Sequence, residues 1–173
     1  MSLLRNERGA AVVEMAMVAP VLALMTIGVI DMSNAYSKKL ALEQGAQRAI
    51  EKIMNTTETS TVEATLANEA VCQVNGWTTS GGVTTCNTSP ITTSNVTVTW
   101  RLDCVNGPTT LSQSTTDSSV YDGYVAACTG TKVGYVQVTV TDKYTPLFPI
   151  HFASFNGGDS TYHLSATAGI RTM

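Results

Sequence analysis

Four cysteines are the residues of this chain best suited to covalent chemistry, and all of them follow a long apolar segment. None is part of a Cys-x-x-Cys pair, which argues against a zinc ribbon. An even number of cysteines in an exported, Thr-rich region indicates two disulfides, for which three connectivities exist; four buried thiols are the alternative. We favour the connectivity in which each disulfide closes a short local loop, and each bridge then contributes ~3 kcal/mol to stability. The expected pairs are Cys72–Cys86 and Cys104–Cys128.

The other side chains with catalytic potential form no pattern that supports an enzyme. His151 and His163 lack the spacing of metal ligands, and the chain contains neither a GxSxG nor an HExxH motif. Asp117 and Asp122-Gly123 resemble a calcium loop only distantly, because the alternating acidic pattern is missing. The sequence therefore predicts no catalytic residue, no metal site and no cofactor.

The charge composition of the chain argues against one class of partner, nucleic acids. Hydrophobic residues make up 43% of it and charged residues only 13%, with a net charge of −3. A nucleic-acid binder needs a basic patch to neutralise phosphates, so we expect no nucleic-acid partner.

An apolar run over residues 10–30 contains one charge, Glu14. As a helix it spans ~30 Å, the thickness of a bilayer core. Arg5 and Arg8 precede it, and by the positive-inside tendency they stay cytoplasmic, so that everything after Asp31 is exported. A cleaved signal peptide with Ser33-Asn34-Ala35 at its cleavage site is the alternative, although its apolar core is usually ~7–15 residues long.

Hydrophobic periodicity continues beyond the apolar run and predicts one helix over residues 10–54. Its second half carries an apolar stripe at helical spacing. The stripe consists of Leu42, Ala46, Ala49, Ile50 and Ile53. A short helix to about Cys72 should follow, and then antiparallel strands that include Val96–Leu102, Tyr135–Thr141 and His163–Arg171. Tyr144 to Pro149 should cross between strands and cover the stripe. The expected fold class is α+β, with a long N-terminal transmembrane helix that extends into a small antiparallel-sheet domain.

The lone carboxylate of Glu14 has two interpretations. A charge inside an apolar helix costs up to ~2.5–3.5 kcal/mol at the bilayer centre and less near its edge. Glu14 either reaches back to the cytoplasmic headgroups or pairs with a positive group from outside the helix.

With these residues placed, the N-terminus resembles the TadE-like minor pilins of the tight-adherence (Tad, Flp-type) pilus, a branch of the type IV pilus machinery. The resemblance rests on Arg8 to Val21, then Gly28–Asp31 and Ala41–Glu51. It implies that a prepilin peptidase cuts between Gly9 and Ala10, and that Glu14 pairs with the freed amine of a neighbouring subunit. The residue after Glu14 is Met15, where families with this motif usually have Phe or Tyr.

The resemblance also implies a layout and a set of partners. Residues 1–9 would form a cytoplasmic leader, 10–30 the transmembrane helix, 31–54 its periplasmic continuation and 55–173 an extracytoplasmic, pilin-like α+β domain. The expected partners are the bacterial inner membrane, other pilin and minor pilin subunits, the prepilin peptidase and the Tad assembly platform. Two other functions fit the same anchor: an extracellular binding or adhesin module, and a secreted protein that loses a signal peptide.

Overall fold

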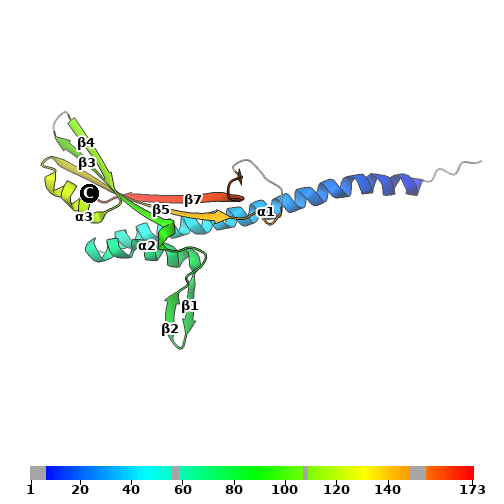
Figure 1. The fold of residues 1–173 in the computed structure, drawn as a ribbon, viewed down its shortest axis with the longest axis horizontal. Helices are drawn as coiled ribbons and strands as arrows, with labels where there is room; N and C mark the ends of the chain where they lie inside the picture. Colours follow the sequence, from blue (N-terminus) through cyan, green and yellow to red (C-terminus); the bar gives the residue numbers. More distant parts are fainter. Residues whose placement is uncertain (1–6, 56–58, 107–108, 149–154) are drawn as a thin grey trace, which may run out of the picture.

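The computed structural model describes residues 7–55, 59–106, 109–148 and 155–173. A long helix leads into a small domain, where its C-terminal half and a second helix lie beside an antiparallel sheet (Figure 1). The elements are α1 (Glu7–Asn55), α2 (Thr59–Asn75), β1 (Trp77–Ser80), β2 (Val83–Cys86), η1 (Thr93–Asn95), β3 (Val96–Asn106), β4 (Thr109–Thr115), α3 (Ser118–Ala127), β5 (Thr131–Tyr144), β6 (Phe155–Asn156) and β7 (Thr161–Arg171). This architecture confirms the predicted α+β class.

Helix α1 forms where the periodicity predicts it, and its apolar stripe packs into the domain. Leu42, Ala46, Ala49 and Ile50 are buried, and Ile53 is partly buried against the same core. Burying the stripe against α2, β5 and β7 stabilises the domain half of α1, because most helical stability in proteins comes from such packing.

Gly45 determines how closely α1 and α2 approach each other. A Cβ atom on Gly45 would lie 2.9 Å from the carbonyl oxygen of Ala70 and 2.5 Å from Cγ2 of Val74. Only a residue without a side chain fits this contact. Helix α2 runs to Asn75, slightly beyond the expected end near Cys72.

The larger sheet has the strand order β4-β3-β5-β7-β6, with antiparallel pairs throughout. In β3 and β5 the alternation of apolar and polar residues sets which face is buried, as the sequence predicts. Trp100 lies opposite Val136 and Val98 opposite Val138. Both pairs face the hydrophobic core, and α1 runs alongside β5 and β7 (Figure 1).

Helix α3 and the hairpin β1–β2 were not among the predicted elements. Asp117 caps α3, since its carboxylate accepts hydrogen bonds from the backbone N–H groups of Ser119 (2.9 Å) and Val120 (3.4 Å). The hairpin turns at Gly81-Gly82, the predicted turn, where both residues have positive φ. It projects from the α2 side of the domain (Figure 1).

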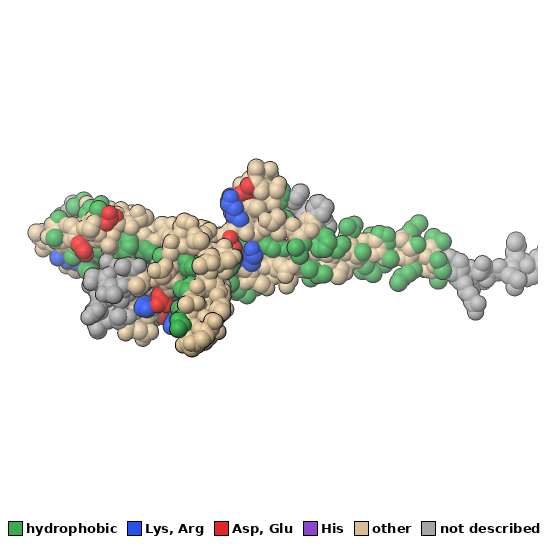
Figure 2. All heavy atoms as spheres, turned by 60° about the horizontal axis from the view of Figure 1, so that its bottom comes forward, with side chains coloured by type: hydrophobic (Ala, Val, Ile, Leu, Met, Phe, Trp, Pro, Cys, Tyr) green, Lys and Arg blue, Asp and Glu red, His purple; other side chains and the backbone are tan. Residues whose placement is uncertain are grey.

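The N-terminal half of α1 protrudes from the domain and is apolar. The helix is long and apolar enough to cross a membrane, and its apolar part is not buried by the rest of the chain. On the face shown in Figure 2, hydrophobic side chains line the protruding helix, whereas the charged side chains gather over the domain and where it meets the helix. A membrane anchor is the role that this surface suggests.

Candidate functional site

Glu14 lies on the exposed apolar surface of α1, close to the start of the helix at Glu7. Its neighbours Val13 and Met15 are exposed as well, by 56% and 65%. None of the ion pairs among the described side chains involves Glu14. Gly9 and Ala10, the expected cleavage site, are part of the same helix.

A buried carboxylate connects α1 to the sheet just beyond the predicted transmembrane run. Asp31 is only 3% exposed. Its Oδ1 accepts a hydrogen bond from the hydroxyl of Tyr144, at the end of β5, and another from the backbone N–H of Leu147 at 3.0 Å. Burial, and then the adjacent Asp31 carboxylate, raises the pKa of Tyr144 to about 12. The phenol therefore stays protonated and can donate this bond.

Lys38 contacts the same junction. Its Nζ lies 5.7 Å from the centroid of the Tyr144 ring and 3.6 Å from Oδ2 of Asp142. The ring of Tyr144 also stacks with that of Tyr162, with 6.5 Å between centroids. Helix and sheet are thus joined by a hydrogen bond, an ion pair and a cation–π contact within one region.

This junction shows that one prediction, on the segment after Tyr144, was wrong. It also gives Asp31 a role that was not predicted from the sequence. The segment from Tyr144 was expected to cover the apolar stripe of α1; instead Tyr144 and Leu147 meet Asp31, and α2, β5 and β7 cover the stripe. Pro149 lies outside the described residues. From the sequence, Asp31 was considered only as the charge that ends the apolar run. One signal could have indicated that Asp31 is buried: the residues that follow it, Met32 to Tyr36, carry no further charge.

Two disulfides fasten the domain. Cys72 of α2 is bonded to Cys86 at the end of β2, and Cys104 of β3 is bonded to Cys128, which follows α3. These are the two pairs that the sequence favours. Beside the first bridge, Asn75 Nδ2 donates to the carbonyl oxygens of Asn87 (2.8 Å) and Ile91 (2.7 Å), so the base of the hairpin is held on α2.

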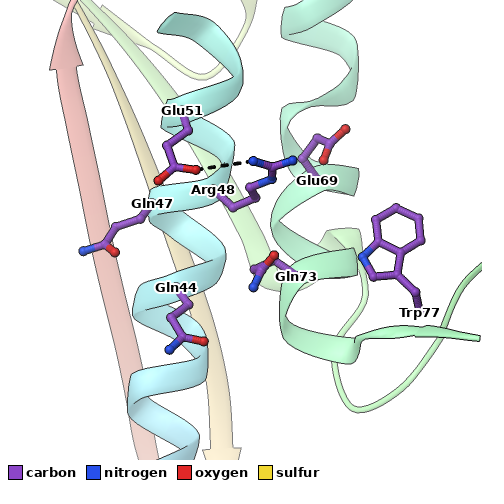
Figure 3. Close-up of a pocket in the computed structure, with 7 residues that line it drawn as sticks. All are labelled: Gln44, Gln47, Arg48, Glu51, Glu69, Gln73 and Trp77. Carbon is purple, nitrogen blue, oxygen red and sulfur yellow. Dashed lines mark hydrogen bonds and ion pairs between the residues drawn. The ribbon is translucent and has the colours of Figure 1, made fainter. Parts of the chain in front are cut away.

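A polar groove of about 310 Å³ runs between α1 and α2 (Figure 3). Its charged groups are already paired: Arg48 Nη1 lies 3.4 Å from Glu51 Oε2, and Glu69 Oε1 lies 2.5 Å from the Nζ of Lys52. Figure 3 shows Arg48 reaching from α1 toward α2 while Gln47 points away. The lining residues are Gln44, Gln47, Arg48, Glu51, Glu69, Gln73 and Trp77, a set able to form hydrogen bonds but without a nucleophile.

Of the residues singled out in the sequence, His163 and Asp117 have structural partners. His163 Nε2 lies 2.6 Å from Asp159 Oδ2, and the same carboxylate is 2.8 Å from the Nζ of Lys143. Hydrogen bonds from Lys143, and then His163, lower the pKa of Asp159. Asp117 caps α3, and His151 lies outside the described residues. No group of three metal-ligating side chains occurs among the described residues.

Fold and site together define a protein in which one apolar N-terminal helix carries a disulfide-bonded α+β domain. Comparison with protein families adds a match of residues 9–50 to the family described as TadE-like protein. This match confirms the resemblance read from the N-terminal residues, and it suggests a role in Tad pilus systems. No curated protein and no solved structure matches the chain significantly.

Proposed function

We propose that this protein is a minor pilin or pseudopilin that takes part in assembling a Tad-type (Flp) pilus. Helix α1 anchors it in the bacterial inner membrane, and the domain after residue 54 lies in the periplasm or in the pilus. The observation that carries the proposal is Glu14, a carboxylate exposed on an apolar helix within the segment that matches the TadE-like family.

The proposed role of Glu14 follows from the cost of its charge. A carboxylate within the bilayer is unfavourable unless a positive group or water meets it. Cleavage by a prepilin peptidase after Gly9 would free the α-amine of Ala10 on each subunit. The amine of an incoming subunit then pairs with Glu14 of its neighbour, and the two opposite charges offset much of each other's desolvation.

Pairing of this kind would also fix the relative height of the subunits. Apolar helices in lipid slide past one another at little cost, because lipid tails and side chains are equally apolar. One charged pair at a defined position removes that freedom. The protein therefore acts through binding to other pilin subunits and to the assembly platform, and the proposal includes no catalysis.

Substitution of Glu14→Gln tests this role, because it keeps the shape of the side chain and removes its charge. The matched control is Glu43→Gln, which removes an exposed glutamate from the domain half of the same helix, where Lys39 Nζ is 4.0 Å away. Breaking a buried ion pair costs about 3–5 kcal/mol, enough to reduce association between subunits strongly.

The measurement is the amount of pilin and assembly-platform protein that co-purifies with each variant after mild detergent extraction. We expect Glu14→Gln to lose most of its partners and Glu43→Gln to keep them. Equal recovery with Glu14→Gln and the unmodified protein would refute the proposed role of Glu14.

A further inference from the structure

The outer surface of α1 stays free of exposed charges for several residues beyond Asp31. The carboxylate of Asp31 is buried against the domain, whereas Met32 and Tyr36 are 58% and 62% exposed. The next exposed charges along the helix are Lys38 and Lys39, with side chains 42% and 48% exposed. The part of α1 without an exposed charge therefore extends from Met15 to Ser37, which at ~1.5 Å per residue is ~33 Å.

Two polar side chains in the segment after Ile30 form hydrogen bonds within the protein. The Asp31 carboxylate accepts hydrogen bonds from the Tyr144 hydroxyl and from the backbone N–H of Leu147. Ser37 Oγ donates to the carbonyl oxygen of Ser33 at 2.9 Å. Internal satisfaction of polar groups is what residence at membrane depth requires, because the hydrocarbon offers them no partner. The absence of exposed charge and the internal bonds of Asp31 and Ser37 fit a position at the membrane boundary.

The loop after β5 lies at the same level. The backbone N–H of Leu147 is bonded to Asp31, which holds the loop against α1, yet the Leu147 side chain is 64% exposed. An exposed leucine thus stands beside the apolar helix surface and continues it sideways onto the domain.

We propose that Leu147 and its loop, residues 145–148, form a second membrane-contacting element, seated where the headgroups meet the acyl chains. The inference rests on the proposed function, in which α1 spans the bilayer. The boundary of the membrane then lies at Tyr36–Lys39 and not at Ile30–Asp31. Tyr36 takes the interfacial position typical of exposed aromatic residues, and Lys38 and Lys39 reach the headgroups.

The surroundings of Leu147 favour the lipid bilayer as the partner that covers its exposed side chain. Leu147 adjoins the exposed apolar surface of α1, the surface that the proposed function places in lipid, so one continuous medium covers both. The exposed ion pair of Lys143 and Asp159 needs water or lipid headgroups, so it limits how deeply the loop can enter the membrane. Two contacts, helix and loop, would hold the domain at one tilt over the membrane.

Depth-dependent quenching of a fluorescent label tests this proposal. The full-length protein is labelled with an environment-sensitive dye at a single introduced cysteine, which is feasible because the four native cysteines are disulfide-bonded. Leu147→Cys is compared with Leu111→Cys, a control of similar exposure (61%) on β4, and with Val21→Cys in the middle of the apolar helix. Each is reconstituted into phosphatidylethanolamine–phosphatidylglycerol vesicles containing lipids with a shallow or a deep nitroxide quencher.

We expect the Leu147 label to lose its emission mainly to the shallow quencher, the Val21 label mainly to the deep one, and the Leu111 label to neither. If the Val21 label is quenched while the Leu147 label behaves like that at Leu111, the loop contact is refuted and the anchor stands. If Val21 is not quenched either, the anchor itself fails. A Leu147 signal that changes only with protein density, and not with either quencher, would assign the loop to a second copy of the chain and overturn the proposal.

Discussion

Substitution of Tyr144→Phe should destabilise the domain by about 2 kcal/mol. A hydrogen bond to a charged group contributes about 1.5–3 kcal/mol, and its loss leaves the buried Asp31 carboxylate without one of its donors. The loss is partial, because the N–H of Leu147 still donates to Asp31. Phenylalanine retains the ring that packs beneath Lys38 and against Tyr162, so the change isolates the hydroxyl.

The effect can be measured by thermal unfolding of the full-length protein in detergent micelles. For a chain of 150–250 residues, 1 kcal/mol corresponds to about 2–4 °C in Tm, so the variant should unfold about 4–8 °C lower. Tyr135→Phe is the matched control. Tyr135 is 37% exposed on the outer face of the sheet, and surface changes stay within about 0.5 kcal/mol. Equal Tm values for the two variants would refute the stabilising role of the Asp31–Tyr144 bond.

Three further predictions concern the stability of the domain. Replacing both Cys104 and Cys128 by serine should lower the free energy of unfolding by about 3 kcal/mol, because the bridge closes a loop with a sequence separation of 24; an unchanged denaturant midpoint would contradict this. Gly45→Ala should lower the free energy of unfolding by about 1–3 kcal/mol through overpacking. Gly123→Ala in α3, where a Cβ meets nothing within 4 Å, should raise it by up to about 1 kcal/mol. Urea titration should therefore give changes in the free energy of unfolding of opposite sign for the two variants. The pKa of Asp159 is lowered in the folded protein, so its carboxylate stabilises the fold above the ordinary aspartate pKa of about 3.9, and this stabilisation is lost as the pH falls toward the folded pKa. Asp159→Asn should therefore lose less stability than the wild type between about pH 5 and pH 3. Parallel losses of stability in the two proteins would refute this prediction.

Regular patterns in the sequence predicted most of the fold, because burial imposes them. The stripe that begins at Leu42 has helical spacing, and the valines of β3 and β5 alternate, so both elements and their buried faces could be inferred before any coordinates. The central register, with Val98 opposite Val138, could not, since it depends on which strands become neighbours in space.

Helix α3 was missed because its local signals are weak and mixed. Asp117 was considered as a cation ligand, and the glycine and β-branched residues nearby disfavour a helix. Its capping role becomes visible only once Ser119 and Val120 are seen to donate to its carboxylate. The importance of Asp31 was hidden for a different reason. Its partners Tyr144 and Leu147 are distant in sequence, and only the packing of β5 against α1 brings them together.

Of the candidate site, the position of Glu14 in an apolar helix was evident from the sequence, and the structure adds its exposure to the surroundings. The groups that meet it belong to other subunits in the proposed function, so a single chain carries only half of the interaction. The family match over residues 9–50 supplies the reason to look for the other half at the N-terminus of a neighbour.

The central claim, a pilin whose freed amine meets a neighbour's Glu14, is tested most directly by mass spectrometry of the N-terminal peptide of the protein purified from its own membranes. A chain that begins at Ala10 with a free α-amine is the predicted result. A chain that still begins at Met1 or Ser2 would make the helix a plain anchor, and one that begins at Tyr36 would make the protein a secreted one; either result would contradict the account.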